Sequence, residues 1–272
     1  MKRISILLLG LLLFYSAYAH GDLDARIQKV TDEIQSYPDS AYLFLKRGEL
    51  FYQHEEYGKS ILDFKKCTSL NYSNPRLYFA YAKSYIKQEE FALSLTFIDQ
   101  ILSNNELNVK ALRLRGQVLY IQYQFDEAAK SFEMVITHSE KTFPYNYLEA
   151  SLAHIKSNHE DAVENAIKCI EYGIKDLGEL NIFYIRLIEL YLSDKNYRSA
   201  LEYHSKMLAN TNRKEKLLYK RALTYIKMGD INAAKLDLEM SLTAIEELPQ
   251  RIKNNKAMKD LKSNVLQTLE NL

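Results

Sequence analysis

The residues of this sequence best suited to chemistry are two cysteines and six histidines, and none of them forms a recognised catalytic or metal-binding motif. The chain has no His-Glu-x-x-His, no Cys-x-x-Cys, no Gly-x-Ser-x-Gly and no glycine-rich phosphate loop. His154 and His159 are five residues apart across a predicted helix–turn junction, so they do not share a helix face. We therefore predict no catalytic residues, no metal site and no cofactor.

The composition indicates that helices position whatever site the chain has. Of the 272 residues, 47% are hydrophobic and 26% are charged, as in ordinary folded proteins. Only 8 glycines and 4 prolines are present, fewer than the turns of a β-sandwich or a doubly wound α/β fold usually need. The formal net charge of +1 gives no electrostatic case for binding nucleic acid or an anionic membrane.

The first residues have the pattern of a secretory signal peptide. Two basic residues precede an apolar stretch at residues 4–14, and Ala-Tyr-Ala at 17–19 supplies the small residues of a cleavage site. The alternative is an N-terminal membrane anchor, but the apolar stretch is short for the ~20 residues that span a bilayer. We expect residues 1–19 to be removed and the mature chain, beginning at His20, to be periplasmic or secreted.

The remaining sequence repeats with a period of 34 residues. One column of mostly small residues falls in the middle of each predicted first helix: Gly48, Ala82, Gly116, Ala150, Ile188 and Ala222. Twelve positions after each of these stands a second small residue: Ser60, Ser94, Ala128, Ala162, Ala200 and Ala234. The steps along each column are 34, 34, 34, 38 and 34 residues, which indicates a repeated structural unit.

Larger side chains occupy three further columns at fixed distances from the small residues. The column three residues after the first small position holds Phe51, Tyr85, Leu119, Ala153, Tyr191 and Tyr225. The column six residues further on holds Tyr57, Phe91, Phe125, His159, Tyr197 and Ile231. The column four residues after the second small position holds Phe64, Ile98, Phe132, Ala166, His204 and Leu238. Small residues let antiparallel helices approach closely, and spacings of three and four place the larger ones on one helix face.

These columns resemble the signature of the tetratricopeptide repeat, a Gly or Ala three residues before an aromatic and then Ala-x-x-x-Phe, at period 34. The clearest copies are residues 41–74 and 109–142. The fourth and fifth copies depart from the signature, because Ala153 and Ala166 replace aromatics and Ile188 replaces a small residue. The resemblance implies an all-α fold, a right-handed α-solenoid of helix–turn–helix repeats that binds proteins or peptides.

The repeat register predicts a signal peptide (1–19), an N-terminal capping helix (20–40), six repeats and a C-terminal capping helix (249–272). The predicted repeats are 41–74, 75–108, 109–142, 143–180, 181–214 and 215–248. In the last repeat, Gly229 should end the first helix and Asp230 should cap the second. Four extra residues between the fourth and fifth copies fall at 173–180, where we expect a longer loop or a change of superhelical angle.

Cys67 and Cys169 occupy the same predicted inward column, seven residues after the second small residue of their copies. Export would permit a disulfide. The two residues lie three repeats apart, however, and packed helices are ~8–10 Å apart. Their Cα atoms should therefore be beyond the ~7 Å that a disulfide tolerates. We predict two buried free thiols.

Proteins of this family usually bind an extended peptide or a partner helix in a concave groove lined by the first helices. The resemblance places nine residues of the second and third repeats there: Arg76, Phe79, Lys83, Ile86, Lys87, Lys110, Arg113, Gln117 and Tyr120. Five of the nine are basic, which favours a partner with acidic groups or a free carboxylate. The alternative interpretation is an ordinary charged helix face. The family's carboxylate clamp for chaperone C-termini needs Lys and Asn where this chain has Leu45 and Glu49, so that function is not predicted.

We therefore predict a non-catalytic scaffold for protein–protein interaction that acts outside the cytoplasm. Its expected partner is a protein or peptide, with no nucleic acid and no membrane span once the signal peptide is removed. The alternative is a structural subunit of a cell-envelope or secretion assembly, which would use the convex face and the ends of the solenoid. An enzyme would need a set of reactive residues that this sequence does not contain.

Overall fold

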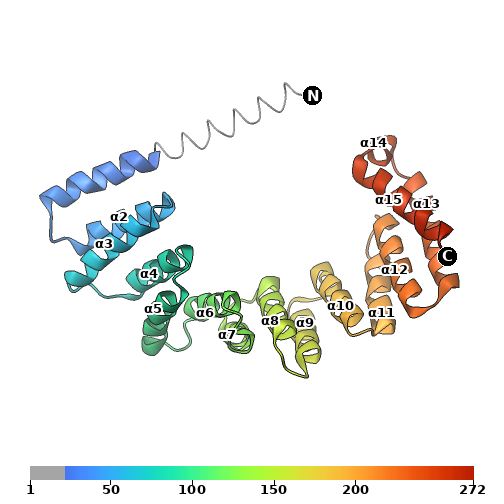
Figure 1. The fold of residues 1–272 in the computed structure, drawn as a ribbon, viewed down its shortest axis with the longest axis horizontal. Coiled ribbons are helices and arrows are strands. Elements are labelled where there is room, and N and C mark those ends of the chain that lie inside the picture. The colour runs from blue at the N-terminus through green and yellow to red at the C-terminus, as the bar shows by residue number, and fades with distance from the viewer. Residues whose placement is uncertain (1–21) are drawn as a thin grey trace. The chain divides into compact units, whose positions relative to one another are not determined.

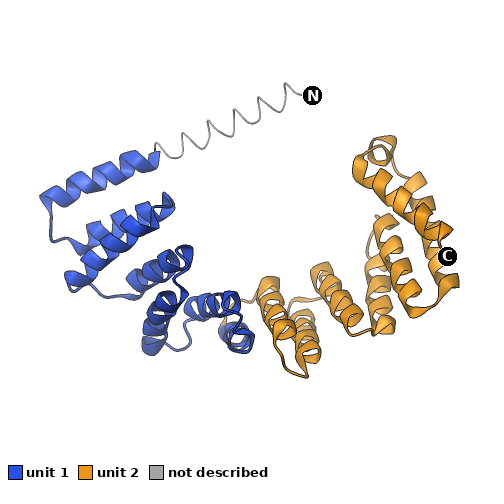
Figure 2. Ribbon diagram, in the orientation of Figure 1, with its two compact units in different colours: residues 1–138 blue, residues 139–272 orange. Residues whose placement is uncertain are grey.

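The computed structural model describes residues 22–272, and all regular secondary structure in this part of the chain is helical (Figure 1). The predicted signal peptide and His20 lie outside the described residues. Contacts between helices divide the chain into two compact units, unit 1 (residues 1–138) and unit 2 (residues 139–272), coloured separately in Figure 2. Within each unit, helices adjacent in the chain pack as pairs, so the predicted all-α solenoid is confirmed. Among the described helices, none is both long enough and apolar enough to cross a bilayer.

Each of the six predicted repeats contains one pair of helices. The part of unit 1 that the structure describes begins with a helix at residues 22–36 and continues with α2 (Ala41–Gln53), α3 (Tyr57–Ser69), α4 (Pro75–Lys87), α5 (Phe91–Asn104), α6 (Val109–Ile121) and α7 (Phe125–His138). Unit 2 contains α8 (Pro144–Lys156), α9 (Ala162–Leu177), α10 (Asn181–Ser193), α11 (Tyr197–Ala209), α12 (Glu215–Met228), α13 (Ile231–Glu246), α14 (Gln250–Lys253) and α15 (Lys256–Glu270).

In the first and third pairs, the small residue of the first helix faces the larger residue that follows it by sixteen positions, on the second helix. A Cβ atom added to Gly48 would lie 2.5 Å from Cε1 of Phe64, and one added to Gly116 would lie 2.7 Å from Cε1 of Phe132. Such distances are far inside van der Waals contact. The two glycines therefore make room for a phenyl ring, which explains why these columns alternate between small and large residues.

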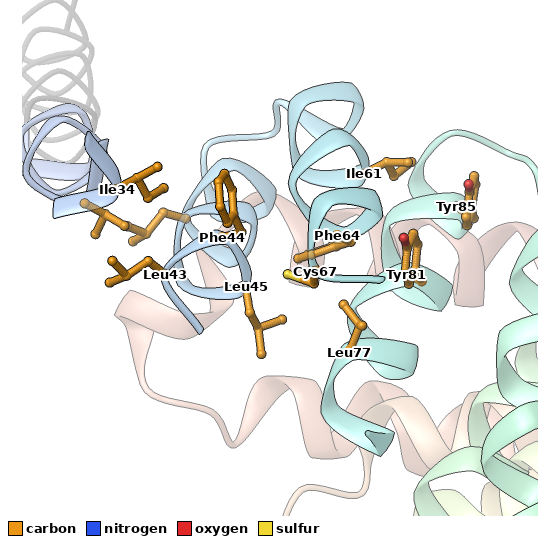
Figure 3. Close-up of a cluster of buried hydrophobic side chains, with 12 residues drawn as sticks. Ile34, Leu43, Phe44, Leu45, Ile61, Phe64, Cys67, Leu77, Tyr81 and Tyr85 are labelled. Carbon is orange, nitrogen blue, oxygen red and sulfur yellow. The ribbon is translucent and has the colours of Figure 1, made fainter. Parts of the chain in front are cut away.

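The core of unit 1 begins where the N-terminal helix, α2, α3 and α4 meet (Figure 3). Phe64 of α3 is completely buried, and its ring packs edge-on against Tyr81 of α4 with centroids 5.5 Å apart. Cys67 lies in the same cluster and donates its S–H to the backbone oxygen of Ala41 at 3.2 Å. Burial, followed by the nearby charge of Asp63, raises the pKa of the Cys67 thiol to about 12. Such a thiol is unreactive at neutral pH.

The second cysteine, Cys169, is also buried, on α9 in unit 2. Neither cysteine is part of a disulfide. Both thiols are therefore buried, as predicted, and no disulfide joins them.

Buried arginine–aspartate pairs join the two helices of a pair in both units. Arg47 of α2 donates two hydrogen bonds, of 2.8 and 2.7 Å, to the carboxylate of Asp63 on α3. Arg221 of α12 donates two bonds of 2.7 Å to Asp237 on α13 in the same geometry. Each pair again joins residues sixteen positions apart. In both cases the hydrogen bond to the carboxylate is the main cause that raises the pKa of the arginine.

The turn between the two helices of a pair has one conformation in five of the six pairs. Its left-handed residue is Glu55, Glu89, Tyr123, Lys195 or Gly229, with φ between 58° and 87°. The next backbone N–H bonds the carbonyl five residues earlier, as in the bond from Glu56 to Phe51 at 2.8 Å. This is the 6→1 bond of a Schellman motif. Only the sixth pair has glycine at the left-handed position, where Gly229 ends α12 as predicted, and Asp230 caps α13 by accepting a hydrogen bond from Ala233 N–H at 3.0 Å.

The four extra residues of the fourth repeat lengthen a helix and do not form a longer loop. Helix α9 runs through Leu177, and only residues 178–180 separate it from α10. Gly173, where the loop was expected to begin, is buried inside α9, and an added Cβ would lie 2.8 Å from Cζ of Phe183. The prediction of a longer loop is therefore wrong. The actual end of the helix is Gly178, whose φ of +85° suits a glycine.

The C-terminal segment caps the last pair, but as two helices where one was predicted. The short helix α14 ends near Asn254, and Asn255 starts α15 by accepting a hydrogen bond from Met258 N–H at 2.8 Å. An asparagine N-cap begins a new helix more readily than it continues an old one. Val265 of α15 is completely buried and packs with Ala222 and Leu238, while most of α15 remains exposed.

Candidate partner-binding groove

The first helices of the three pairs in unit 1 line a groove of about 870 Å³, which we call the unit 1 groove. It is lined by Glu49, Tyr52 and Gln53 of α2, by Phe64 of α3, by Pro75, Arg76, Phe79, Ala80 and Lys83 of α4, and by Lys110, Arg113, Leu114 and Gln117 of α6. The lining residues come from the last part of α2 and from the first two-thirds of α4 and α6.

Six of the nine residues predicted to bind a partner line this groove together: Arg76, Phe79, Lys83, Lys110, Arg113 and Gln117. The other three, Ile86, Lys87 and Tyr120, do not line it, because they lie near the ends of α4 and α6, beyond the point where the groove crosses these helices. Ile86 packs against the buried cluster around Ala82 and Ile98. The ring of Tyr120 packs edge-on against Phe125, with centroids 5.1 Å apart.

Sequence reasoning missed the contribution of α2 to the groove. Glu49, Tyr52 and Gln53 stand 34 residues before Lys83, Ile86 and Lys87, so the predicted columns pass through all three. Extending the columns back by one repeat would have found them.

Asparagine caps fix the start of the two helices that carry most of the basic residues. Asn74 accepts a hydrogen bond from Leu77 N–H at 2.9 Å at the start of α4, and Asn108 accepts one from Ala111 N–H at 3.1 Å at the start of α6. The caps are 34 residues apart, and each stands two residues before a basic residue of the groove, Arg76 or Lys110. The sequence thus places both cations in the first turn of their helices.

The charges of the groove are less uniform than the five predicted basic residues implied. Arg76 donates hydrogen bonds of 2.8 and 2.6 Å to the carboxylate of Glu49, and this contact raises the pKa of Arg76. Its charge is therefore largely neutralised. Lys83 and Lys110 remain as the positive charge in excess, beside the half-buried ring of Phe79, and Arg113 also lines the groove. The basic surface of the groove is thus smaller than predicted, and it is centred between α4 and α6.

No family model matches the chain. A stretch of 103 residues, 37% of the chain, is 32% identical to the Hsp70-Hsp90 organising protein of Plasmodium falciparum. This stretch spans 18% of the length of that relative.

Two solved bacterial structures resemble nearly the whole chain. The C-terminal part of a TPR repeat-containing protein from Cytophaga hutchinsonii has a TM-score of 0.66 at 15% identity, covering 91% of this chain and 98% of that one. A tetratricopeptide repeat protein from Parabacteroides merdae has a TM-score of 0.54 at 16% identity, covering 93% and 95%. The chain therefore has the fold of tetratricopeptide-repeat proteins.

Proposed function

We propose that the chain is a non-catalytic scaffold that acts outside the cytoplasm and holds an acidic segment of a partner protein in the unit 1 groove. The tetratricopeptide fold is typical of scaffolds for protein–protein interaction. The observation that carries the acidic character of the partner is the composition of the groove, where four basic side chains face a single acidic one, Glu49. Charge-assisted hydrogen bonds to carboxylates are the contacts that such a surface makes best.

The proposed location rests on the N-terminal sequence. A short basic start, an apolar stretch and a small-x-small site are the features by which an exported chain is recognised and cleaved. The two buried thiols are compatible with an oxidising compartment, since neither is available for disulfide exchange.

The relative that carries the name Hsp70-Hsp90 organising protein raises chaperones as partners. We do not propose them. The carboxylate clamp needs a lysine where this chain has Leu45, and Leu45 is completely buried. At the clamp's asparagine position, Glu49 accepts two hydrogen bonds from Arg76 and, unlike an asparagine amide, has no N–H to donate to an incoming carboxylate.

Capture of partners from the extracytoplasmic fraction of the cells that make the protein would test this function. The double charge reversal Lys83→Glu and Lys110→Glu should weaken the captured partner at least tenfold, since a hydrogen bond to a charged group contributes about 1.5–3 kcal/mol and about 1.4 kcal/mol is tenfold in affinity. Binding of the unaltered protein should also weaken as salt rises.

The matched control is the double reversal Lys65→Glu and Lys87→Glu, which changes two exposed lysines of unit 1 that lie outside the groove. It changes the net charge equally and should leave affinity within about twofold. If both double variants bind the partner as the unaltered chain does, the groove is only a solvated helix face. A structural subunit that uses its convex face and ends would then be the better description.

A further inference from the structure

Unit 2 contains a separate pocket of about 440 Å³, which we call the unit 2 pocket, between α10, α11 and α12. Its lining is largely aliphatic and comprises Ile185, Ile188, Leu192, Met207, Leu217, Leu223 and Ile226, with Glu189, His204, Lys220, Thr224 and Lys227 as the polar members. A concave, mostly apolar surface with a few polar groups and a volume of about 300–1,000 Å³ is characteristic of small-molecule sites.

The pocket coincides with a reversal of the repeat pattern. Ile188 stands in the column that holds Gly48 and Gly116 in unit 1, and His204 stands in the column that holds Phe64 and Phe132. The first helix thus carries a large aliphatic side chain where unit 1 has glycine, and the second helix carries a smaller, polar ring where unit 1 has phenylalanine. Both substituted residues line the pocket.

His204 is the one polar ring in the pocket wall, and it is almost completely buried, with 2% exposed. Its Nε2 lies 3.3 Å from Oγ1 of Thr224, and that hydroxyl donates to the backbone oxygen of Lys220 at 3.2 Å. Since the hydroxyl has a single hydrogen, Nε2 must be the donor to Oγ1, which leaves Nδ1 unprotonated. Within the described residues, Nδ1 has no hydrogen-bond partner. Burial, followed by the charges of Lys220 and Arg221, lowers the pKa of His204 to about 4, so this imidazole is uncharged at neutral pH.

The polar groups around the aliphatic lining are predominantly cationic. Lys220 and Lys227 are exposed, and neither forms an ion pair with any residue of the described part of the chain. The one acidic lining residue, Glu189, pairs with Arg186 at 3.3 Å. An apolar surface bordered by two uncompensated ammonium groups is complementary to an apolar molecule with a negative end.

We propose that the unit 2 pocket binds a small carboxylic acid with an apolar body, whose carboxylate meets the ammonium groups of Lys220 and Lys227. The apolar body lies against the side chains of α10 and α12. This site differs from the unit 1 groove in ligand class, because it holds a small amphipathic molecule and the groove holds a protein segment. The proposed binding of a small acid does not depend on whether the groove binds a protein partner.

Calorimetric titration of the full chain with octanoate, decanoate and 1-decanol, below micelle formation, tests the proposal. We expect saturable binding of one decanoate per chain, weaker binding of octanoate, and at least tenfold weaker binding of the uncharged decanol. Replacing both cations, Lys220→Gln with Lys227→Gln, should weaken decanoate at least tenfold and leave decanol unchanged. The control Lys216→Gln with Lys235→Gln removes two exposed lysines outside the pocket and should change neither ligand.

A second pair of variants tests the apolar part. Ile185→Glu places a carboxylate in the pocket lining and should abolish decanoate binding, whereas Ile182→Glu, on the same helix but outside the pocket, should not. The two side chains are matched in exposure, at 42% for Ile185 and 47% for Ile182. Circular dichroism should show that both variants remain helical.

Three outcomes would overturn the proposal. The first is the absence of saturable binding of either acid, and the second is equal affinity for decanoate and decanol. The third is an equal effect of Ile185→Glu and Ile182→Glu. If instead Ile185→Glu weakens a captured protein partner while no acid binds, the pocket receives an apolar side chain of that partner, and the small-molecule assignment is wrong.

Discussion

The unit 1 groove and the unit 2 pocket lie in different repeats but are lined from equivalent positions of the repeated helix pair, and their side chains differ in chemistry. Lys83 of the groove and Leu223 of the pocket each follow the small residue of their first helix by one position. Arg113 and Ile185 each stand three positions before the residue of that column. The repeat therefore determines which positions line a binding surface, and the side chains at those positions determine whether that surface is mainly charged or mainly apolar.

The frameworks beneath these two surfaces are alike. The buried pairs Arg47–Asp63 and Arg221–Asp237 have the same spacing and the same two-bond geometry. The binding chemistry therefore differs both at exposed positions and at the buried column positions Ile188 and His204, while the arginine–aspartate pair is the same in both units. The predictions below test this comparison, from the largest expected effect to the smallest.

Removing either buried carboxylate should have the largest effect on stability. Asp63→Ala in unit 1 and Asp237→Ala in unit 2 should each lower the free energy of unfolding by about 3 kcal/mol or more, because a half-buried arginine loses both of its charge-assisted hydrogen bonds, each worth about 1.5–3 kcal/mol. Urea denaturation measures the loss, and hydrogen exchange should place it in the altered unit. As a control, Glu164→Ala breaks the exposed pair with Lys168 and should cost less than about 1 kcal/mol. A similar small loss in all three variants would show that the buried pairs are not a common framework.

Acid should weaken unit 2 through His204 in a way that has no equivalent at Phe64 or Phe132 of unit 1. The folded-state pKa of His204 is about 4, and the ordinary value is 6.5. Between pH 6.5 and 4, His204 binds a proton in the unfolded chain but not in the folded chain. The free energy of unfolding therefore falls as pH falls through this range. The loss is about 3 kcal/mol at about 1.4 kcal/mol per pH unit.

Urea denaturation at a series of pH values, with and without His204→Leu, isolates this contribution. Leucine is the residue that faces the first helix at this position in the sixth pair, as Leu238. The variant should lose less stability between pH 6.5 and 5 than the unaltered chain. Identical pH profiles would contradict the burial of a neutral His204.

Filling the glycine column of unit 1 should cost less. In Gly48→Ala the new methyl group meets the rigid ring of Phe64, and overpacking of about 1–3 kcal/mol outweighs a helix-propensity gain of about 1 kcal/mol. Adding Phe64→Leu recreates the Ala222–Leu238 combination of unit 2 and should recover part of the loss. Gly58→Ala is the control, because its added Cβ meets only Gln88 Nε2, at 3.7 Å. Urea midpoints compare the three variants, and a stabilising Gly48→Ala would refute the proposed fit of ring and glycine.

The smallest effect on stability is expected at Glu49. Glu49→Gln breaks an exposed ion pair with Arg76, so the free energy of unfolding should change by less than about 1 kcal/mol. The same variant frees the charge of Arg76 and should tighten an acidic partner several-fold. The affinity of a captured partner, measured at low and high salt, checks this. Weaker binding would mean that Glu49 itself contacts the partner.

The sequence columns predicted the helix pairs well because each column has a local steric cause. Gly229 and Asp230 were placed correctly, since a left-handed turn and a side-chain cap depend on few neighbours. The insertion in the fourth repeat was misjudged because Gly173 suggested a loop by propensity. Its contact with Phe183, a residue of another helix, fills the space and keeps the segment helical. Such tertiary contacts override propensity and cannot be read from one segment.

The groove was predictable in part for the same reason. The columns gave the correct face of α4 and α6, which brings Lys83 and Lys110 to one surface. They did not show that the groove ends before Lys87, or that Glu49 pairs with Arg76 of the next repeat. Both depend on contacts between neighbouring repeats, which the register of a single repeat does not contain.

The left-handed turns within the helix pairs have a consequence for protein engineering. Glu55, Glu89, Tyr123 and Lys195 hold a conformation that costs a residue with a Cβ about 1–2 kcal/mol. Glycine would remove that cost. Because glycine is more flexible in the unfolded chain, about 0.5–1 kcal/mol of the gain would be offset when it becomes ordered on folding. Changing all four to glycine would therefore raise the melting temperature while leaving both ligand-facing surfaces untouched. The natural sequence is thus less thermostable than its fold allows, as expected where selection removes only variants that fall below the stability needed for function.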